Sequence, residues 1–234
     1  MTDLYEQHAD LYDLAFDWDV EDELDWLLER LGPHCRSVLE PGCGSGRMLE
    51  LFARRGLEVI GIDRSAAMVK LACARGLEVA LADMTDFDLG RTFDGAVCPI
   101  NTLGHLSPAD LGRHLERMGR HLRPGARYLV QLQLGAELRA SRWEANGLRV
   151  TWTTERADVE AGRQYQRSRI ETQAGEVVEE LHVLTLWTPE AWAAAVAGSP
   201  FALTAVFDGG RDGRPPVEPG TEGPLLWHEL TRSG

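Results

Sequence analysis

The sequence predicts an α/β fold in which a doubly wound parallel sheet carries an antiparallel β insertion. From Arg36 to Leu134, short apolar runs alternate with helical patterns, as they do when parallel strands are joined by crossover helices. Between residues 147 and 187 the helical patterns disappear, and strand-like runs are separated by turn residues such as Ala174-Gly175. The 234 residues are expected to form one domain, because α/β chains of this length often do.

The elements of the parallel core follow in order. Its expected strands are Ser37–Glu40, Glu58–Asp63, Glu78–Ala82, Gly95–Pro99 and Arg127–Gln133. Its expected helices are Glu21–Leu31, whose leucines lie on one face, and then Arg47–Arg55, Ala66–Arg75 and Ser107–Leu122. Ser65 and Ser107 are placed as N-caps of the last two, and Pro108 takes a first helical position.

The second half is predicted to be mostly antiparallel. The expected strands are Leu148–Thr154, Gln164–Glu171 and Val177–Trp187, followed by a helix from Thr188 to Ala197 and by strands Ala202–Phe207 and Pro224–Leu230. The domain therefore divides into an N-terminal lid and helix (1–33), a core (34–135), an insertion (147–187) and a final helix with a closing hairpin (188–234).

Charge and composition argue against several classes of protein. A net charge of −13, without clustered Lys and Arg, disfavours binding to nucleic acid or to anionic membranes. No apolar run of about 18 residues is present, so a membrane span is not expected. The acidic, aromatic N-terminus lacks the pattern of a secretory signal, which predicts a cytoplasmic protein. The cysteines are widely spaced and no zinc site is expected; His114 and His121 are expected on a solvated helix face.

The stretch Glu40-Pro41-Gly42-Cys43-Gly44-Ser45-Gly46 joins the first core strand to a helix. Glycines allow sharp turns and close approach of a ligand to the backbone, and the helix start offers N–H groups to a polar ligand. The second strand ends in Asp63, which a doubly wound sheet places beside this turn, where its carboxylate can accept hydrogen bonds from ribose hydroxyls. Asp63 could instead cap the next helix. Together with the glycines, it favours nucleoside binding.

Dinucleotide-binding enzymes share these two features but differ in detail. Their G-x-G-x-x-G fingerprint needs a third glycine where this chain has Arg47, and Gly46 comes one position early. Glu40 would repel a pyrophosphate, whereas it would attract a cofactor that carries a sulfonium and an ammonium. A nucleotide-dependent oxidoreductase therefore remains only an alternative.

These motifs, with Ala82-Asp83-Met84, Phe93–Val97 and Leu122–Ala126, resemble the class I S-adenosylmethionine-dependent methyltransferases over roughly residues 37 to 134. The resemblance implies a Rossmann-like, doubly wound, seven-stranded sheet, with the antiparallel insertion covering the active site. It also implies methyl transfer from S-adenosylmethionine to a small-molecule nitrogen or oxygen. Cys98-Pro99-Ile100-Asn101 departs from the Asn/Asp/Ser-Pro-Pro-aromatic tetrad of DNA amino methyltransferases, and the stretch that follows resembles the small-molecule branch.

The resemblance also implies a role for individual residues. Gly42, Gly44 and Gly46 would wrap the methionine part, with Glu40 near its ammonium and Arg47 either pairing with its carboxylate or facing solvent. Asp63 and the adjacent Arg64 would lie at the ribose, and the adenine would contact Met68, Asp83 and Met84. Ile100 and Asn101 would line the methyl-transfer site. Tyr12 and Trp18 belong to a segment that would fold over the cofactor.

Methyl transfer needs mainly alignment, which contributes about 7–11 kcal/mol, against about 3–5 kcal/mol from a general base. The candidate base is His105, with Tyr12 as a second; either could instead serve packing or backbone hydrogen bonding. Polar residues of the insertion could face inward and read the acceptor, or face outward, where the sheet could form a homodimer surface: Arg149, Trp152, Arg167, Arg169 and His182. A non-catalytic binding module with this fold is the remaining alternative.

Overall fold

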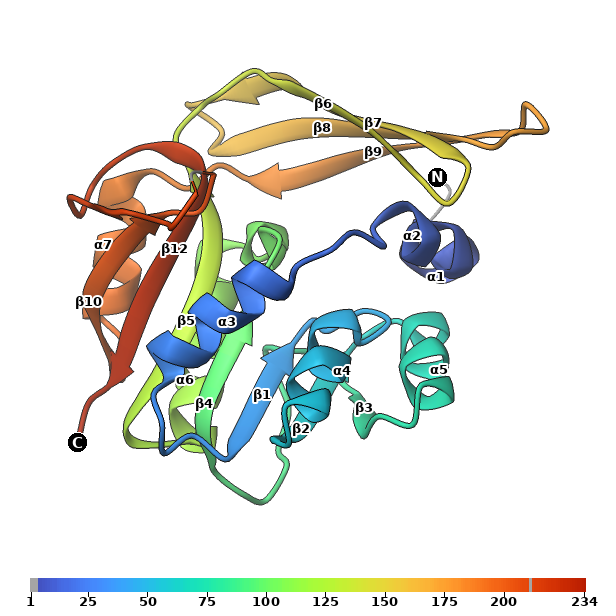
Figure 1. Ribbon diagram of the computed structural model, residues 1–234. Helices are drawn as coiled ribbons and strands as arrows, with labels where there is room; N and C mark the ends of the chain where they lie inside the picture. The colour runs from blue at the N-terminus through green and yellow to red at the C-terminus, as the bar shows by residue number, and fades with distance from the viewer. Residues whose placement is uncertain (1–3, 211) are drawn as a thin grey trace.

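The computed structural model describes residues 4–210 and 212–234. The main sheet contains β1 (Ser37–Pro41), β2 (Glu58–Asp63), β3 (Val79–Leu81), β4 (Phe93–Cys98), β5 (Leu122–Leu134), β10 (Phe201–Asp208), β11 (Pro216–Val217) and β12 (Gly223–Arg232). A second sheet, the cover sheet, contains β6 (Ala140–Ala145), β7 (Leu148–Asp158), β8 (Arg163–Glu171) and β9 (Val177–Thr185). The cover sheet lies above the ends of the main-sheet strands (Figure 1).

The strand order of the main sheet is β11-β10-β12-β5-β4-β1-β2-β3. β1 pairs in parallel with both β2 and β4, so the chain crosses to opposite sides of β1. All five residues of β1 are buried, as expected for a central parallel strand covered on both faces. β12 runs antiparallel to β5 and β10, which closes the sheet as a hairpin.

Helices cover both faces of the main sheet. They are α3 (Glu21–Leu31), α4 (Arg47–Arg54), α5 (Ala66–Ala74), α6 (Pro108–His121) and α7 (Pro189–Ala197). One apolar cluster joins α3 and α4 to Val38 and Leu129, while another joins α6 and α7 to Leu39 and Val130. Consecutive strand residues thus enter opposite cores, which is the alternation that a pleated strand imposes.

The predicted fold class is confirmed, but the main sheet has eight strands in the described residues rather than seven. The additional strand is β11, two residues that pair antiparallel with Val206 and Phe207 of β10. A segment containing Pro216 gave no strand signal, because proline is confined to the edges of sheets. β11 is the edge strand here.

The cover sheet begins at Ala140 rather than near Gly147, because β6 forms a hairpin with β7. The turn is Asn146-Gly147, with φ values of 49° and 77°. Two consecutive positive φ angles suit the right-handed twist of a hairpin, and Asn-Gly is a strong sequence signal for such a turn. That signal was present in the sequence, and it places one more strand in the cover.

His114 and His121 are buried, so the expectation of a solvated helix face was wrong. The ring of His114 lies between the carbonyl of Met84 and the hydroxyl of Tyr128, at 3.0 and 2.8 Å. Nε2 of His121 accepts the backbone N–H of Leu89 at 2.9 Å. Each imidazole forms hydrogen bonds with backbone or hydroxyl groups beneath α6. The arginines that surround these histidines in the sequence suggested an exposed helix face and gave no sign of these partners.

The N-terminal segment forms two short helices, α1 (Leu4–Gln7) and α2 (Ala9–Ala15), which we call the lid. α1 contacts α5, and α2 contacts α5 and β7, so the lid bridges the main and cover sheets (Figure 1). Residues 1–3 of the predicted N-terminal segment lie outside the described residues. None of the helices described is long and apolar enough to cross a membrane.

Gly46 is the N-cap of α4 and has a φ of +80°. A Cβ there would lie 2.4 Å from Cδ1 of Leu77, so Gly46→Ala adds overpacking to backbone strain. We expect a loss of about 2–4 kcal/mol in the free energy of unfolding, measured with urea. Gly76 is a matched control, since its φ is also +80° and a Cβ would meet nothing within 4 Å. Gly76→Ala should cost only about 1–2 kcal/mol, and equal costs would contradict the packing argument.

Candidate functional site

A cavity of about 720 Å³ lies between the main sheet, the lid and the cover sheet. It opens where the loops after β1 and β4 diverge, at the point where the strand order reverses. Open α/β sheets bind ligands in the crevice at this position, because the two loops leave the sheet in opposite directions. The cavity is therefore the candidate site.

The glycine loop after β1 forms one wall. Gly42 and Gly44 have φ values of 67° and 55°, and both line the cavity. A Cβ on Gly42 would lie 2.5 Å from Cγ2 of Thr102, so the loop after β4 approaches it closely. A Cβ on Gly44 would meet only Sδ of Met68, at 3.9 Å. Gly46 does not line the cavity, and it packs against Leu77 instead of contributing to the wall.

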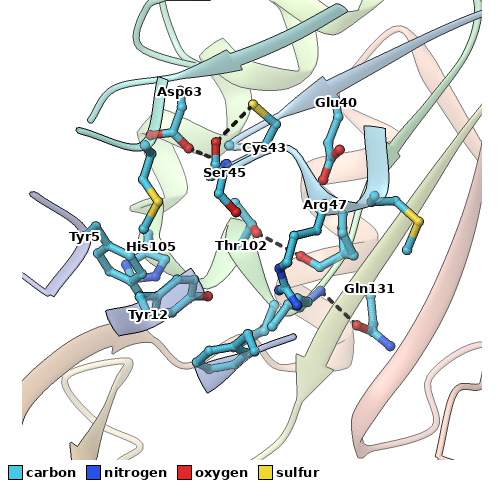
Figure 2. Close-up of a pocket in the computed structure, with 18 of the residues that line it drawn as sticks. Tyr5, Tyr12, Glu40, Cys43, Ser45, Arg47, Asp63, Thr102, His105 and Gln131 are labelled. Carbon is cyan, nitrogen blue, oxygen red and sulfur yellow. Dashed lines mark hydrogen bonds between the residues drawn. The ribbon is translucent and has the colours of Figure 1, made fainter. Parts of the chain in front are cut away.

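Asp63 connects the ends of β2 and the glycine loop. Its Oδ2 accepts the N–H of Gly44 at 2.8 Å (Figure 2), and its Oδ1 accepts the N–H of Ser65, also at 2.8 Å. Burial raises its pKa, while these N–H groups act in the opposite direction. The carboxylate lines the cavity with a fixed orientation, and each oxygen keeps a lone pair for a further donor such as a ribose hydroxyl.

Glu40 and Arg47 lie at the methionine end that the resemblance predicts. Glu40 is buried, and its Oε2 has no hydrogen-bond partner among the described residues. Burial raises the pKa of Glu40 to about 8, against a lowering effect of Arg47. The guanidinium of Arg47 lies 5.8 Å from the ring of Phe16 and 5.9 Å from that of Trp18. A buried acceptor without a partner fits the ammonium of an amino-acid moiety.

The opposite end of the cavity is lined by residues that follow β2 and β3. Met68 is buried on α5, and Met84 and Arg64 lie nearby on the wall. Oδ1 of Asp83 accepts both the N–H and the hydroxyl of Thr85 at 2.7 Å, which lowers the pKa of Asp83. An ionised acceptor and two thioether side chains fit an adenine ring with an exocyclic amine.

The loop after β4 adopts a strained conformation. Ile100 and Asn101 have φ values of 56° and 55°, which is unusual for residues other than glycine. Oε1 of Gln131 accepts the N–H of Ile100 at 2.8 Å, and Oδ1 of Asn101 accepts the N–H of Gln133 at 3.0 Å. β5 thus holds the loop, and strain of this kind persists only where the surroundings impose it.

His105 and Tyr12 both line the cavity, and the pKa of each is shifted away from that of the free side chain. His105 presents much of its surface to the cavity, yet surrounding protein lowers its pKa to about 4, with a smaller effect from Arg64. Its imidazole is neutral at pH 7. Burial raises the pKa of Tyr12 to about 12, so its phenol can donate a hydrogen bond at neutral pH but is not a base.

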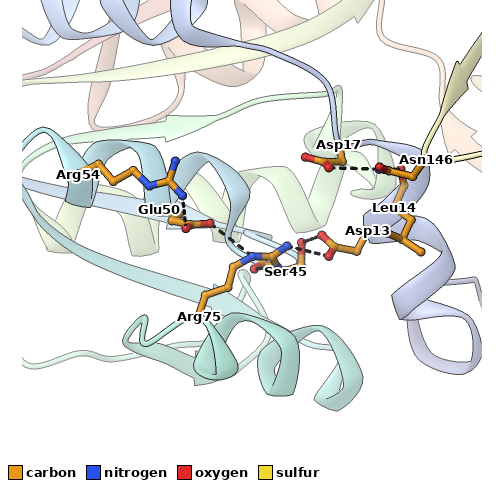
Figure 3. Close-up of polar contacts among 8 residues, drawn as sticks. All are labelled: Asp13, Leu14, Asp17, Ser45, Glu50, Arg54, Arg75 and Asn146. Carbon is orange, nitrogen blue, oxygen red and sulfur yellow. Dashed lines mark hydrogen bonds and ion pairs between the residues drawn. The ribbon is translucent and has the colours of Figure 1, made fainter.

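The lid is tied directly to the glycine loop. Arg75 donates to Oδ2 of Asp13 and to the carbonyl of Ser45, each at 2.7 Å, and the hydroxyl of Ser45 donates to Asp13 (Figure 3). Asn146 of the cover donates to the carbonyl of Leu14 at 3.0 Å. Helix α2, which carries Tyr12, is therefore fixed to both the glycine loop and the cover.

The two faces of the cover sheet differ in chemistry. Trp152, Thr154, Gln166 and Leu184 line the cavity. Arg149, Arg167 and Arg169 form ion pairs with glutamates on the exposed side, so the outward alternative holds for these arginines. His182 is buried, stacking on Trp152 with ring centroids 4.7 Å apart and meeting the hydroxyl of Ser168 at 2.9 Å. The inner wall is thus aromatic and amide-rich.

Several cavity residues were not singled out from the sequence: Tyr5, Gln131, Gln133, Arg139 and Gln166. The two glutamines of β5 had a signal, since the pattern Gln-Leu-Gln-Leu places polar groups on one face of an apolar strand. Within the described residues, no group of three or more His, Cys, Asp or Glu side chains is arranged to hold a metal.

Residues 38–125 match the family described as Methyltransferase domain. The dTDP-3-amino-3,6-dideoxy-alpha-D-glucopyranose N,N-dimethyltransferase of Streptomyces fradiae is 31% identical over 229 residues, covering 88% of each chain. The dTDP-4-amino-2,3,4,6-tetradeoxy-D-glucose N,N-dimethyltransferase of Saccharopolyspora spinosa is 35% identical, but the match spans only 53% of each protein. The solved structure of S-adenosylmethionine-bound CalS10, an amino pentose methyltransferase from Micromonospora echinaspora, has a TM-score of 0.73 at 24% identity, with both chains fully covered.

A doubly wound sheet with a glycine loop and an acid beside it at the switch point is typical of nucleoside-binding α/β proteins. The chain belongs to the class I S-adenosylmethionine-dependent methyltransferases, in the branch that acts on small molecules. Its cofactor is S-adenosylmethionine, whose methyl group is activated for transfer by the positive sulfur.

Binding of the cofactor should be linked to the ionisation of Glu40. With a pKa of about 8, Glu40 is mostly protonated at pH 7 in the cofactor-free protein. A cofactor ammonium favours the ionised form, so binding of S-adenosylhomocysteine at pH 7 should release up to about one proton, and affinity should rise with pH until about pH 8. Calorimetry in two buffers of different ionisation enthalpy measures this release. Glu40→Gln should bind more weakly and release none; proton uptake by the wild type would contradict the assignment.

Proposed function

We propose that the protein methylates the amino group of a nucleotide-linked amino sugar. The observation that supports this proposal is the part of the cavity beyond the loop after β4. Its wall contains Trp152, Gln131, Gln133 and Gln166. Such a wall suits a ligand with an apolar ring face and several oxygens. The relatives from Streptomyces fradiae and Saccharopolyspora spinosa are named for dTDP-amino sugars. Arg139 also lines the cavity, and a guanidinium suits a phosphate group.

Nitrogen is favoured over oxygen as the nucleophile. A neutral amine attacks the methyl carbon directly, the nitrogen–carbon bond forms as the sulfur–carbon bond breaks, and the sulfur takes the electron pair. Alignment supplies most of the rate. A hydroxyl would need a strong base, whereas His105, with a pKa of about 4, is a weak one and Tyr12 stays protonated.

In this reaction, different residues of the chain bind different parts of the cofactor and the acceptor. Glu40 and Arg47 hold the amino-acid end of the cofactor, Asp63 its ribose, and Met68, Asp83 and Met84 its adenine. Tyr12 of the lid and Trp18, which follows the lid in the chain, cover it and exclude water, while Ile100 and Asn101 border the methyl group. His105 faces the same space, and its imidazole passes to solvent the proton that the methylated amine loses, because with a pKa of about 4 it does not stay protonated at pH 7.

The proposal is tested with purified protein, S-adenosylmethionine and dTDP-3-amino-3,6-dideoxy-α-D-glucopyranose. We expect mass spectrometry to show a methylated sugar nucleotide together with S-adenosylhomocysteine. Asp63→Ala is the control, because it removes the ribose contact and should weaken cofactor binding and turnover together. S-adenosylmethionine bound without any methylated sugar would refute the acceptor class, and binding of NAD(H) in its place would support the oxidoreductase alternative.

His105→Ala should lower kcat on the order of 10- to 100-fold, the lower part of the range for a proton acceptor, because the imidazole is a weak base. The dissociation constant of S-adenosylmethionine should change by less than about twofold, because in the proposed reaction His105 interacts with the proton of the amine and not with the cofactor. His34→Ala is the matched control, as His34 is exposed and does not line the cavity. An unchanged kcat would remove His105 from the mechanism.

A further inference from the structure

Two glutamines of β5, Gln131 and Gln133, form part of the cavity wall and are nearly buried, each with 6% of its surface exposed. They lie two residues apart and so share one face of the strand. An amide side chain can offer either its oxygen or its nitrogen, and which one faces the cavity is decided by its neighbours. Here the neighbours decide it for both residues.

The orientation of Gln133 is set by a chain of hydrogen bonds from the cover sheet. Nε1 of Trp152 donates to Oε1 of Gln166 at 2.7 Å, and an indole N–H can only donate. The nitrogen of Gln166 therefore faces the other way, toward Oε1 of Gln133 at 3.4 Å and Oε1 of Gln164 at 3.3 Å. Gln164 in turn donates to the carbonyl of Thr185 at 3.5 Å, which can only accept. Both ends of the chain fix its direction.

The orientation of Gln131 is set from the other side. Its Oε1 accepts the N–H of Ile100, a backbone group that can only donate (Figure 2). Each glutamine thus commits its oxygen to the protein and keeps its two N–H groups. No hydrogen bond from Nε2 of Gln131 or Gln133 is formed within the part of the chain that the structure describes. The wall therefore presents neutral donors to the cavity.

The donors adjoin the methyl-transfer site. The backbone N–H of Gln133 holds the side chain of Asn101, and the amide oxygen of Gln131 holds Ile100, the two residues that border the methyl group. Amide N–H groups donate to oxygen lone pairs, whereas a donor to the amine nitrogen would occupy the lone pair that must attack the methyl group. A hydroxyl next to the reacting amine satisfies them, whereas the amine itself lies away from them.

We propose that Gln133 is a specificity-determining residue that donates a hydrogen bond to a ring hydroxyl flanking the acceptor amine, in an orientation fixed by Trp152 and Gln166. The inference rests on the proposed function. A site built to hydrogen-bond a hydroxyl discriminates against analogues that lack it, because its buried donor is then left unpaired.

Three acceptors form a graded series for the test. The dTDP-3-amino-3,6-dideoxy sugar has hydroxyls on both sides of its amine, the 3-amino-3,4,6-trideoxy sugar on one side, and the 4-amino-2,3,4,6-tetradeoxy sugar on neither. Each loss of a flanking hydroxyl, from the first sugar to the second and from the second to the third, is one step of this series. For the wild type, kcat/KM should fall by about tenfold or more at one of these two steps. Gln133→Met, similar in length but without donors, should abolish that step and leave the rate with the tetradeoxy sugar within about twofold of wild type.

Two further variants separate recognition from structure. Gln133→Glu replaces the donor by an acceptor and should lower kcat/KM for the hydroxylated sugar at least as much as Gln133→Met. Gln173→Met, on an exposed turn of the cover, should change nothing. A Gln133→Met variant that keeps both wild-type steps, or that loses all three acceptors equally, overturns the inference while the proposed function stands. A wild type that methylates none of the three sugars refutes the proposed function, and this inference with it.

Discussion

The hydrogen bond from the N–H of Gly44 to the carboxylate of Asp63 links the turn after β1 to the end of β2, and the rest of the site depends on it. It holds a glycine turn, otherwise free to move, against the sheet at the switch point. Ser45, next in the chain, then meets Asp13 and Arg75, so the lid is aligned with the same turn. The glycine loop, Asp63 and the lid form one connected unit.

Burial controls the charges of several groups that line the cavity. The same low-dielectric cavity raises the pKa of Glu40 and Tyr12 and lowers that of His105, because it disfavours each charged form. Burial therefore favours the neutral forms of Glu40, Tyr12 and His105 at pH 7. In the proposed reaction, a cationic cofactor would restore the charge of Glu40, while burial favours the neutral form of His105. Enclosure by the lid and cover thus tunes binding and proton transfer together.

Much of this architecture could be predicted from local sequence signals. The helix Glu21–Leu31 and the strand Glu58–Asp63 have the expected bounds, because leucine periodicity and a buried apolar run bounded by turn residues are strong patterns. β6 and β11 were missed: one needed its Asn146-Gly147 turn to be recognised, and the other forms only through pairing with β10. The burial of His114 depends on Tyr128 and Met84, two partners that no pattern within α6 contains.

The sequence by itself determined the parallel core, the glycine turn and the acid that follows it, since these depend on residues adjacent in the chain. Tertiary structure alone decided that Gly46 packs against Leu77, that the cover arginines face outward, and that the glutamines of β5 turn their nitrogens to the cavity. The physical reason is distance along the chain. The direction of an amide is set by partners such as Ile100 and Gln166, which only folding brings within reach.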